Sequence, residues 1–151
     1  MATSDARSLY QPELRDMLRL DAPVEVKVSP NGGHVAYSVS TTDWKDDRYE
    51  NICYVHDVAT GVAHPLTRTG SVHQIEWVDD QTITLLKKGP GDDDKAQIVL
   101  YEGLVGEGWT VTSHKTGVEW FKPFAGGFLY WALNPERDER KERVDRFGNT
   151  K

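Results

Sequence analysis

The chain has 151 residues, and its 18 lysine and arginine residues against 24 aspartate and glutamate residues give a formal net charge of −6. An acidic balance without a basic stripe argues against nucleic-acid binding. A mean hydropathy of −0.59 and the lack of an 18-residue apolar run argue against a membrane span. Aromatic residues make up 10% of the chain, which predicts one folded domain or a piece of a larger one.

The first predicted element is a short helix from Pro12 to Leu20. Proline suits the first helical position, where the missing N–H has no intrahelical partner. Leu14, Met17 and Leu18 are spaced i, i+3 and i+4 and would form one apolar stripe. A helix this short is marginal alone, so we expect the stripe to pack on its own domain or to contact a second domain. The segment before it lacks a secretion signal, and we expect a cytoplasmic protein.

Short runs of β-branched and aromatic residues follow, separated by turn signals. Alternating valines on either side of Ser29–Gly33 predict a hairpin. After a polar loop over 41–48, a second hairpin is predicted from strands 52–58 and 62–66. Further strands are predicted at 72–78, 83–86, 98–101, 109–112, 118–121 and 128–133.

These strands repeat as a four-strand unit. The first strands of successive units end at Val28, Trp77 and Phe121, which gives spacings of 49 and 44 residues. A four-strand unit that recurs at this period is typical of β-propeller blades. An immunoglobulin-like sandwich would supply a similar number of strands, but without the same hairpin order restarting. We therefore predict an all-β fold: an incomplete propeller of about two and a half four-stranded antiparallel blades, preceded by the helix.

The chain divides into an N-terminal extension over 1–22, a partial propeller over 23–133 and a charged loop or start of a next blade segment over 134–151. Acids and bases balance in the last segment, so it is not read as a basic patch. Propellers close with at least four blades. We therefore expect a fragment of a longer propeller or a subunit completed by another chain, because an unfinished sheet exposes apolar faces and an open edge.

No residue pattern predicts catalysis, a cofactor or a metal. The Gly-x-Ser-x-Gly elbow of serine hydrolases is absent, and the five histidines lack the spacing of metal ligands. Asp92, Asp93 and Asp94 are consecutive, whereas calcium loops use alternate positions. The glycines of 103–108 lack the lysine and the strand–loop–helix setting of a phosphate loop. Both segments are interpreted as hairpin connections.

Tryptophan and cysteine provide the remaining candidates. Trp77, Trp120 and Trp131 fall in predicted strands, where we expect them to fill space between stacked blades. Trp44 lies in a polar loop and is a candidate ligand or interface contact, with a structural role equally open. Cys53 has no cysteine partner and is expected to be a small buried hydrophobe.

Several segments, taken in order, resemble the start of a known family. They are "QPELRDMLRL", "VSPNGGHVAYSVS", "DDRYENICYVHDVATGVAHPLT", "WVDDQTITLL" and "PERDERKERVDRFGN". This order is similar to the N-terminal part of the prolyl oligopeptidase family of serine peptidases, in particular its acylaminoacyl-peptidase and dipeptidyl-aminopeptidase-like branch. The Ser-Pro-Asn-Gly and Asp-x-x-Thr-Gly turns are shared with TolB-like propellers.

The resemblance implies a propeller that covers a C-terminal α/β-hydrolase domain and gates the access of short or N-acylated peptides to it. The catalytic serine, aspartate and histidine of that domain have no counterpart here, so the resemblance assigns no catalytic residue and predicts no activity for this chain alone. The predicted partners are that hydrolase domain and the peptide substrates of the parent enzyme. The alternatives are a non-catalytic interaction module, completed by another protein or by a further copy in a homo-oligomer, and a piece of a periplasmic TolB-like propeller, against which the missing signal sequence argues.

Overall fold

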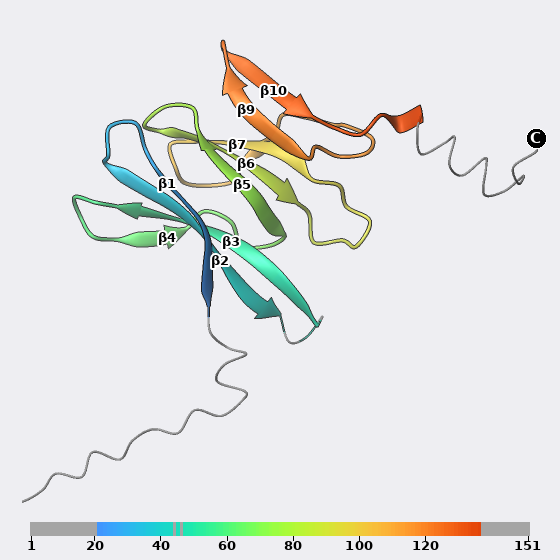
Figure 1. Cartoon of the computed structure of the whole chain (residues 1–151). Coiled ribbons are helices and arrows are strands. Elements are labelled where there is room, and N and C mark those ends of the chain that lie inside the picture. Colours follow the sequence, from blue (N-terminus) through green and yellow to red (C-terminus); the bar gives the residue numbers. More distant parts are fainter. Residues whose placement is uncertain (1–20, 44, 46, 137–151) are drawn as a thin grey trace, which may run out of the picture.

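A computed structural model describes residues 21–43, 45 and 47–136, and it confirms the all-β prediction over this part of the chain (Figure 1). The predicted helix over 12–20 lies outside the described residues. The ten strands are β1 (Ala22–Val28), β2 (His34–Asp43), β3 (Arg48–Asp57), β4 (Ala63–Pro65), β5 (Ser71–Trp77), β6 (Thr82–Lys88), β7 (Gln97–Glu102), β8 (Trp109–Thr110), β9 (Trp120–Phe124) and β10 (Gly127–Trp131).

The strands form three antiparallel sheets, each from consecutive strands. The first sheet has the order β1-β2-β3-β4, the second β5-β6-β7-β8, and the third pairs β9 with β10. None of the three sheets closes on itself. Hairpin connections of this kind need only short turns, which the glycine- and aspartate-rich segments between the strands provide.

The predicted first hairpin is confirmed, and side chains hold its turn. The Ser29 hydroxyl accepts a hydrogen bond from the His34 amide at 3.0 Å, and the Asn31 side chain accepts one from the Gly33 amide at 2.7 Å. Gly32 adopts a φ of 74°, which glycine reaches without steric cost. The residue types of the turn therefore determine where β1 ends and β2 begins.

The polar loop predicted over 41–48 is wrong at both of its ends, because residues 41–43 and Arg48 belong to strands. β2 continues to Asp43 and β3 begins at Arg48, so the ladder extends nearly to the hairpin tip. Arg48 forms ion pairs with Asp43 and with Glu50, at 3.9 and 3.0 Å, and donates a hydrogen bond to the Pro90 carbonyl at 2.7 Å. These contacts are made by polar side chains, so the apolar alternation could not reveal them.

Two later strands also differ from their predicted bounds. β9 begins at Trp120 rather than at 118, because the Val118 amide donates to the Ala96 carbonyl at 2.8 Å and its side chain joins the core. β8 has two residues rather than four. Beyond Thr110, the Thr112 hydroxyl accepts the hydrogen bond of the Ile98 amide at 2.9 Å and so replaces a backbone partner.

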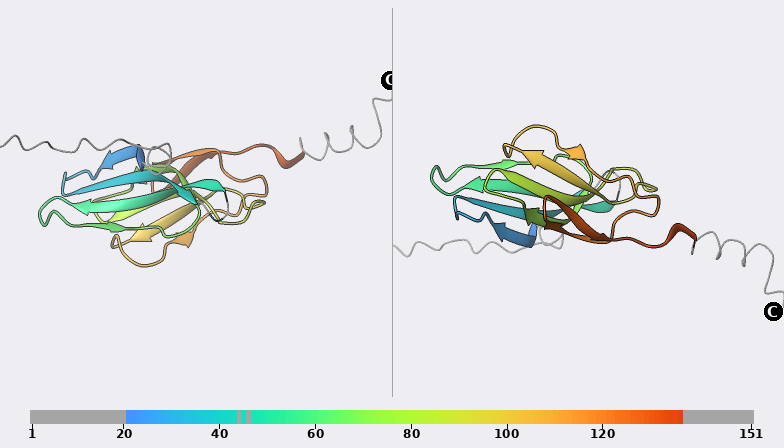
Figure 2. Two further views of the ribbon diagram at one scale, coloured as in Figure 1. Left: turned by 90° about the horizontal axis from the view of Figure 1, so that it is seen from below. Right: turned by 90° about the horizontal axis from the view of Figure 1, so that it is seen from above.

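The three sheets stack on one another through two apolar clusters (Figures 1 and 2). Alternate residues of each strand point to opposite faces, so each face of the second sheet supplies one cluster. The cluster between the first and second sheets includes Cys53, Ile75 and Leu85, all without exposed surface. The cluster between the second and third sheets is built around Phe121, which is also fully buried, and Ile98.

Candidate functional site

The first strands of the three sheets, β1, β5 and β9, meet at one side of the stack (Figure 1). Their polar side chains form a cluster that we name the first-strand junction. Its members are Glu25, Lys27, Gln74, Glu76 and Lys122. The junction brings together residues nearly one hundred positions apart in the sequence.

Glu76 is the centre of the junction and is only 9% exposed. The Lys122 ammonium from β9 lies 2.9 Å from one of its carboxylate oxygens. The other oxygen accepts a hydrogen bond from the Gln74 amide at 3.2 Å and lies 3.7 Å from Lys27 Nζ. Lys27 also lies 3.6 Å from Glu25. Glu76 therefore pairs with lysines of both neighbouring sheets, and Glu25 pairs with Lys27 of its own strand.

Two of these side chains, and that of Trp77 beside them, also bond to the backbone of neighbouring sheets. Glu25 accepts a hydrogen bond from the Ile75 amide at 2.9 Å. Gln74 donates to the Phe121 carbonyl at 2.7 Å and accepts from the Phe121 amide at 3.2 Å. Trp77 donates from its indole N–H to the Lys27 carbonyl at 3.1 Å. The junction thus takes the place of a β-ladder between strands that do not pair.

The two carboxylates of the junction have opposite pKa shifts. Burial would raise the pKa of Glu76, but its hydrogen bonds to Lys122 and Gln74 and the charge of Lys27 together hold that pKa below its usual value. Burial raises the pKa of Glu25, and Lys27 offsets this only in part. The chemistry of this arrangement is that of paired ions that hold three sheets together.

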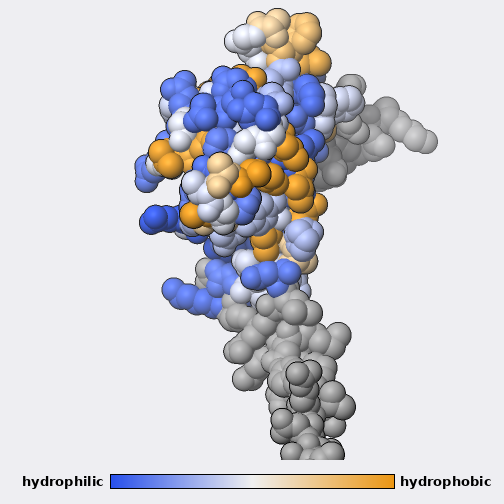
Figure 3. Space-filling view, turned by 90° about the vertical axis from the view of Figure 1, so that its left-hand side faces the viewer, coloured by the Kyte–Doolittle hydropathy of each residue, from blue (hydrophilic) through white to orange (hydrophobic). Residues whose placement is uncertain are grey.

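The outer face of the first sheet is apolar and open. Val24, Val26 and Val28 of β1 are 57 to 59% exposed, whereas the alternate residues Glu25 and Lys27 point toward the second sheet. Hydrophobic side chains are visible among hydrophilic ones on this side of the molecule (Figure 3). A face of β-branched residues at this exposure is typical of a surface that another sheet covers.

The outer face of the third sheet is open as well. Its exposed side chains belong to Trp120, Phe124, Leu129 and Trp131, and the last is 67% exposed. The prediction that Trp120 and Trp131 fill space between sheets is therefore wrong for the described part of the chain. Trp77 does pack against the core between the first and second sheets, as predicted.

Among the described strands, β10 pairs only with β9, so its outer edge is open in this part of the chain. Edge strands usually carry a charge, a proline or a bulge, or are very short, and these features discourage pairing with other strands. The other edge strands have such features: Pro23 and a bulge in β1, a bulge in β5, Lys122 and Pro123 in β9, and lengths of three and two residues in β4 and β8. β10, of sequence GFLYW, has none of them.

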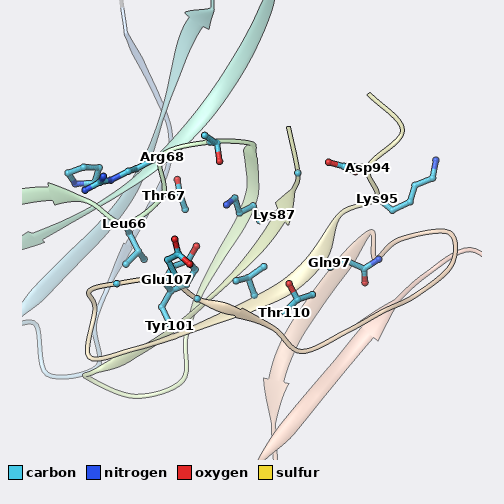
Figure 4. Close-up of a pocket in the computed structure, with 16 residues that line it drawn as sticks. Leu66, Thr67, Arg68, Lys87, Asp94, Lys95, Gln97, Tyr101, Glu107 and Thr110 are labelled. Carbon is cyan, nitrogen blue, oxygen red and sulfur yellow. The ribbon is translucent and has the colours of Figure 1, made fainter. Parts of the chain in front are cut away.

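A pocket of about 700 Å³ lies between the first and second sheets (Figure 4). The pocket lies beside the segment 66–70, which follows the short strand β4 and connects the first sheet to the second. Its polar lining includes Thr67, Arg68, Lys87, Lys95, Tyr101 and Glu107. These residues come from four separate segments, so no local sequence pattern could have revealed the pocket.

The site residues predicted from sequence, Leu14, Met17, Leu18 and Trp44, all lie outside the described residues. The acidic loop is a hairpin connection, as predicted: Asp94 accepts a hydrogen bond from the Gly91 amide at 2.8 Å, and Lys88 donates to the Asp92 carbonyl at 3.0 Å. Within the described part of the chain, no group of three or more acidic, histidine or cysteine side chains is arranged to hold a metal ion.

Cys53 is fully buried, as predicted, and burial raises the pKa of its thiol to about 12. The junction residues, by contrast, were missed by sequence reasoning. The available signal was the presence of Glu25 and Lys27 between alternating valines, and of Gln74 and Glu76 at the corresponding place in the next unit.

Searches against models of known protein families and against curated proteins found no match to this sequence. In the described residues, the structure contains no helix with the length and apolar character that a membrane crossing requires.

Proposed function

We propose that this chain forms the first part of a β-propeller that covers the catalytic domain of a cytoplasmic serine peptidase. The observation that carries the propeller is the stack itself. Consecutive antiparallel sheets pack face to face with their first strands side by side, and apolar faces remain open at both ends. Radial repetition of such sheets is how a propeller buries each face against its neighbour.

The third sheet supports the same proposal. Within residues 21–136 it has two strands where the first two sheets have four, and the open edge of β10 is the place where a third strand would pair. Trp109 in β8 is 49% exposed next to the half-buried Leu100, on the face of the second sheet that packs against the third. Two more strands beside β10 would cover Trp109 and Leu100 on that face of the second sheet.

The peptidase part of the proposal rests on the resemblance of the sequence to the prolyl oligopeptidase family. The propeller would admit short or N-acylated peptides to a C-terminal α/β-hydrolase domain and exclude folded proteins by size. Leu14, Met17 and Leu18 would contact that domain. This chain would supply no catalytic residue, so hydrolysis would depend on the parent enzyme.

The deciding measurement is the intact mass of the native polypeptide, together with its coding frame read past Lys151. A mass several times 17.1 kDa, a downstream Gly-x-Ser-x-Gly elbow and labelling of the parent by a fluorophosphonate would support the proposal. A native polypeptide that ends at Lys151 would contradict it. In the parent, Leu14→Asp combined with Leu18→Asp should loosen the contact between domains and lower selectivity against long peptides.

The second candidate is a non-catalytic interaction module whose open sheet is completed by another chain. The unprotected edge of β10 favours it specifically, because any polypeptide that adds a strand would satisfy that edge. A defined oligomer of the purified 151-residue chain with cooperative melting would support this candidate. A soluble aggregate or a molten, dye-binding state would contradict it.

A further inference from the structure

The pocket between the first and second sheets concentrates positive charge in an acidic protein. Arg68, Lys87 and Lys95 line it, and they are three of the nine lysine and arginine residues in the described part of the chain. Only Asp94 and Glu107 oppose them, out of sixteen described carboxylates. In Figure 4, Arg68 and Lys95 lie toward opposite ends of the pocket with Lys87 between them.

The position of Lys87 is determined by its strand pairing and by a close neighbouring segment. It lies in β6 opposite Gln97 of β7, at the end of the ladder between these strands. The chain passes so close at Gly70 that a Cβ there would lie 3.2 Å from Lys87 Cε. Lys87 is half-buried, yet its ammonium forms no hydrogen bond or ion pair with any described residue. A half-buried cation without a counter-charge favours an anionic ligand.

Hydroxyl groups line the same pocket. Thr67 is 2% exposed, and its oxygen accepts a hydrogen bond from the Cys53 amide at 2.9 Å, so its proton remains available for donation. Tyr101 is 4% exposed and its hydroxyl has no described partner. Burial raises the pKa of Tyr101, so this hydroxyl stays a donor at neutral pH. Both groups suit carboxylate or phosphate oxygens.

We propose that this pocket binds a small organic polyanion with two or more carboxylate or phosphate groups. Lys87 would pair with one group at the centre, beside the Thr67 and Tyr101 hydroxyls, and Arg68 and Lys95 would attract the others. The volume of about 700 Å³ suits such a ligand. Glu107, on the turn at the rim, repels anions and so limits affinity. This site is independent of the proposed peptidase role.

The test measures citrate binding to the purified chain by isothermal titration calorimetry at fixed ionic strength, with acetate as the monovalent comparison. Lys87→Met keeps the aliphatic stem and removes the charge, and we expect it to weaken citrate binding about tenfold. Glu107→Gln should tighten binding about threefold, because it removes a repulsive charge. Lys45→Met is the matched control: an exposed lysine outside the pocket, with the same change in net charge.

Unchanged melting temperatures would show that the variants remain folded. Citrate binding that is stronger than acetate binding, weakened by Lys87→Met and tightened by Glu107→Gln would support the site. Equal effects of the Lys87 and Lys45 substitutions would show a diffuse charge effect and overturn it. Absence of saturation up to about 10 mM citrate would overturn it too, because polyanion sites with several charged partners bind more tightly than that.

Discussion

Gln74 makes the most specific contact between the second and third sheets. Its side chain donates to the carbonyl of Phe121 and accepts from the amide of the same residue, at 2.7 and 3.2 Å. Phe121 is fully buried, so water does not readily replace these bonds. We predict that Gln74→Leu, which keeps a similar volume, destabilises the protein by leaving one N–H and one C=O group without partners.

The size of this effect follows from the two bonds. Each contributes about 1 to 1.5 kcal/mol net, so Gln74→Leu should cost about 2 to 3 kcal/mol of unfolding free energy. Gln74→Glu should cost more, because it loses the donor to the Phe121 carbonyl and adds a negative charge beside Glu76. Gln81→Leu is the matched control, since Gln81 is exposed in the β5–β6 turn and its side chain makes no described hydrogen bond.

Urea denaturation followed by tryptophan fluorescence would give the free energies, because Trp120 and Trp131 lie in the third sheet. Native-state hydrogen exchange would add a local measurement: the Phe121 amide should lose protection in Gln74→Leu while amides of the first sheet keep theirs. A loss below about 0.5 kcal/mol, or one equal to that of Gln81→Leu, would refute the reasoning that Gln74 replaces a ladder between β5 and β9.

Three further predictions follow from single sites. Cys53 should resist alkylation by iodoacetamide at pH 8 until the protein unfolds, because burial raises its pKa to about 12; rapid labelling of the native chain would contradict this. Gly70→Ala should lower the melting temperature strongly, because φ is 79° and a Cβ would lie 2.3 Å from the Lys88 carbonyl oxygen; an unchanged temperature would contradict that contact. Glu76→Gln should destabilise the protein at pH 7, and its difference from the wild type in urea titrations should shrink as the pH falls below the usual carboxyl value of 4.5. The reason is that the pKa of Glu76 is lower in the folded than in the unfolded protein, so its ionised form stabilises the fold and protonation removes that stability. If the difference in unfolding free energy between Glu76→Gln and the wild type grew in acid, the ion pairs of Glu76 would be contradicted.

The sequence predicted the sheets well where local signals determine them. The turn at Ser29–Gly33 and the alternation of valines in β1 and β2 depend on neighbouring residues, and both predictions are confirmed. The start of β9 was misplaced because the Val118 amide pairs with Ala96, more than twenty residues away. The extent of β2 and β3 was underestimated because polar residues such as Asp43 and Arg48, which pair across the two strands, extend the ladder.

The candidate sites were much harder to predict. The first-strand junction depends on which strands lie side by side, and the pocket depends on how far β4 extends. Both are consequences of stacking rather than of local pattern. Lys87 and Lys88 illustrate the difficulty: they are adjacent in the sequence, yet one lines the pocket and the other bonds to the Asp92 carbonyl.

The junction also explains how a stack of separate sheets can remain in register. Apolar packing between sheets is strong but has little directional preference. Gln74, Glu76 and Lys122 add bonds of fixed geometry between β5 and β9, and Glu25 does the same between β1 and β5. A slip of one residue in any first strand would turn these polar groups to the opposite face, where the partners they now bond are absent. A buried polar group that loses its partner destabilises the protein by more than the formed hydrogen bond stabilises it. The junction thus specifies how the sheets are arranged more than it stabilises them.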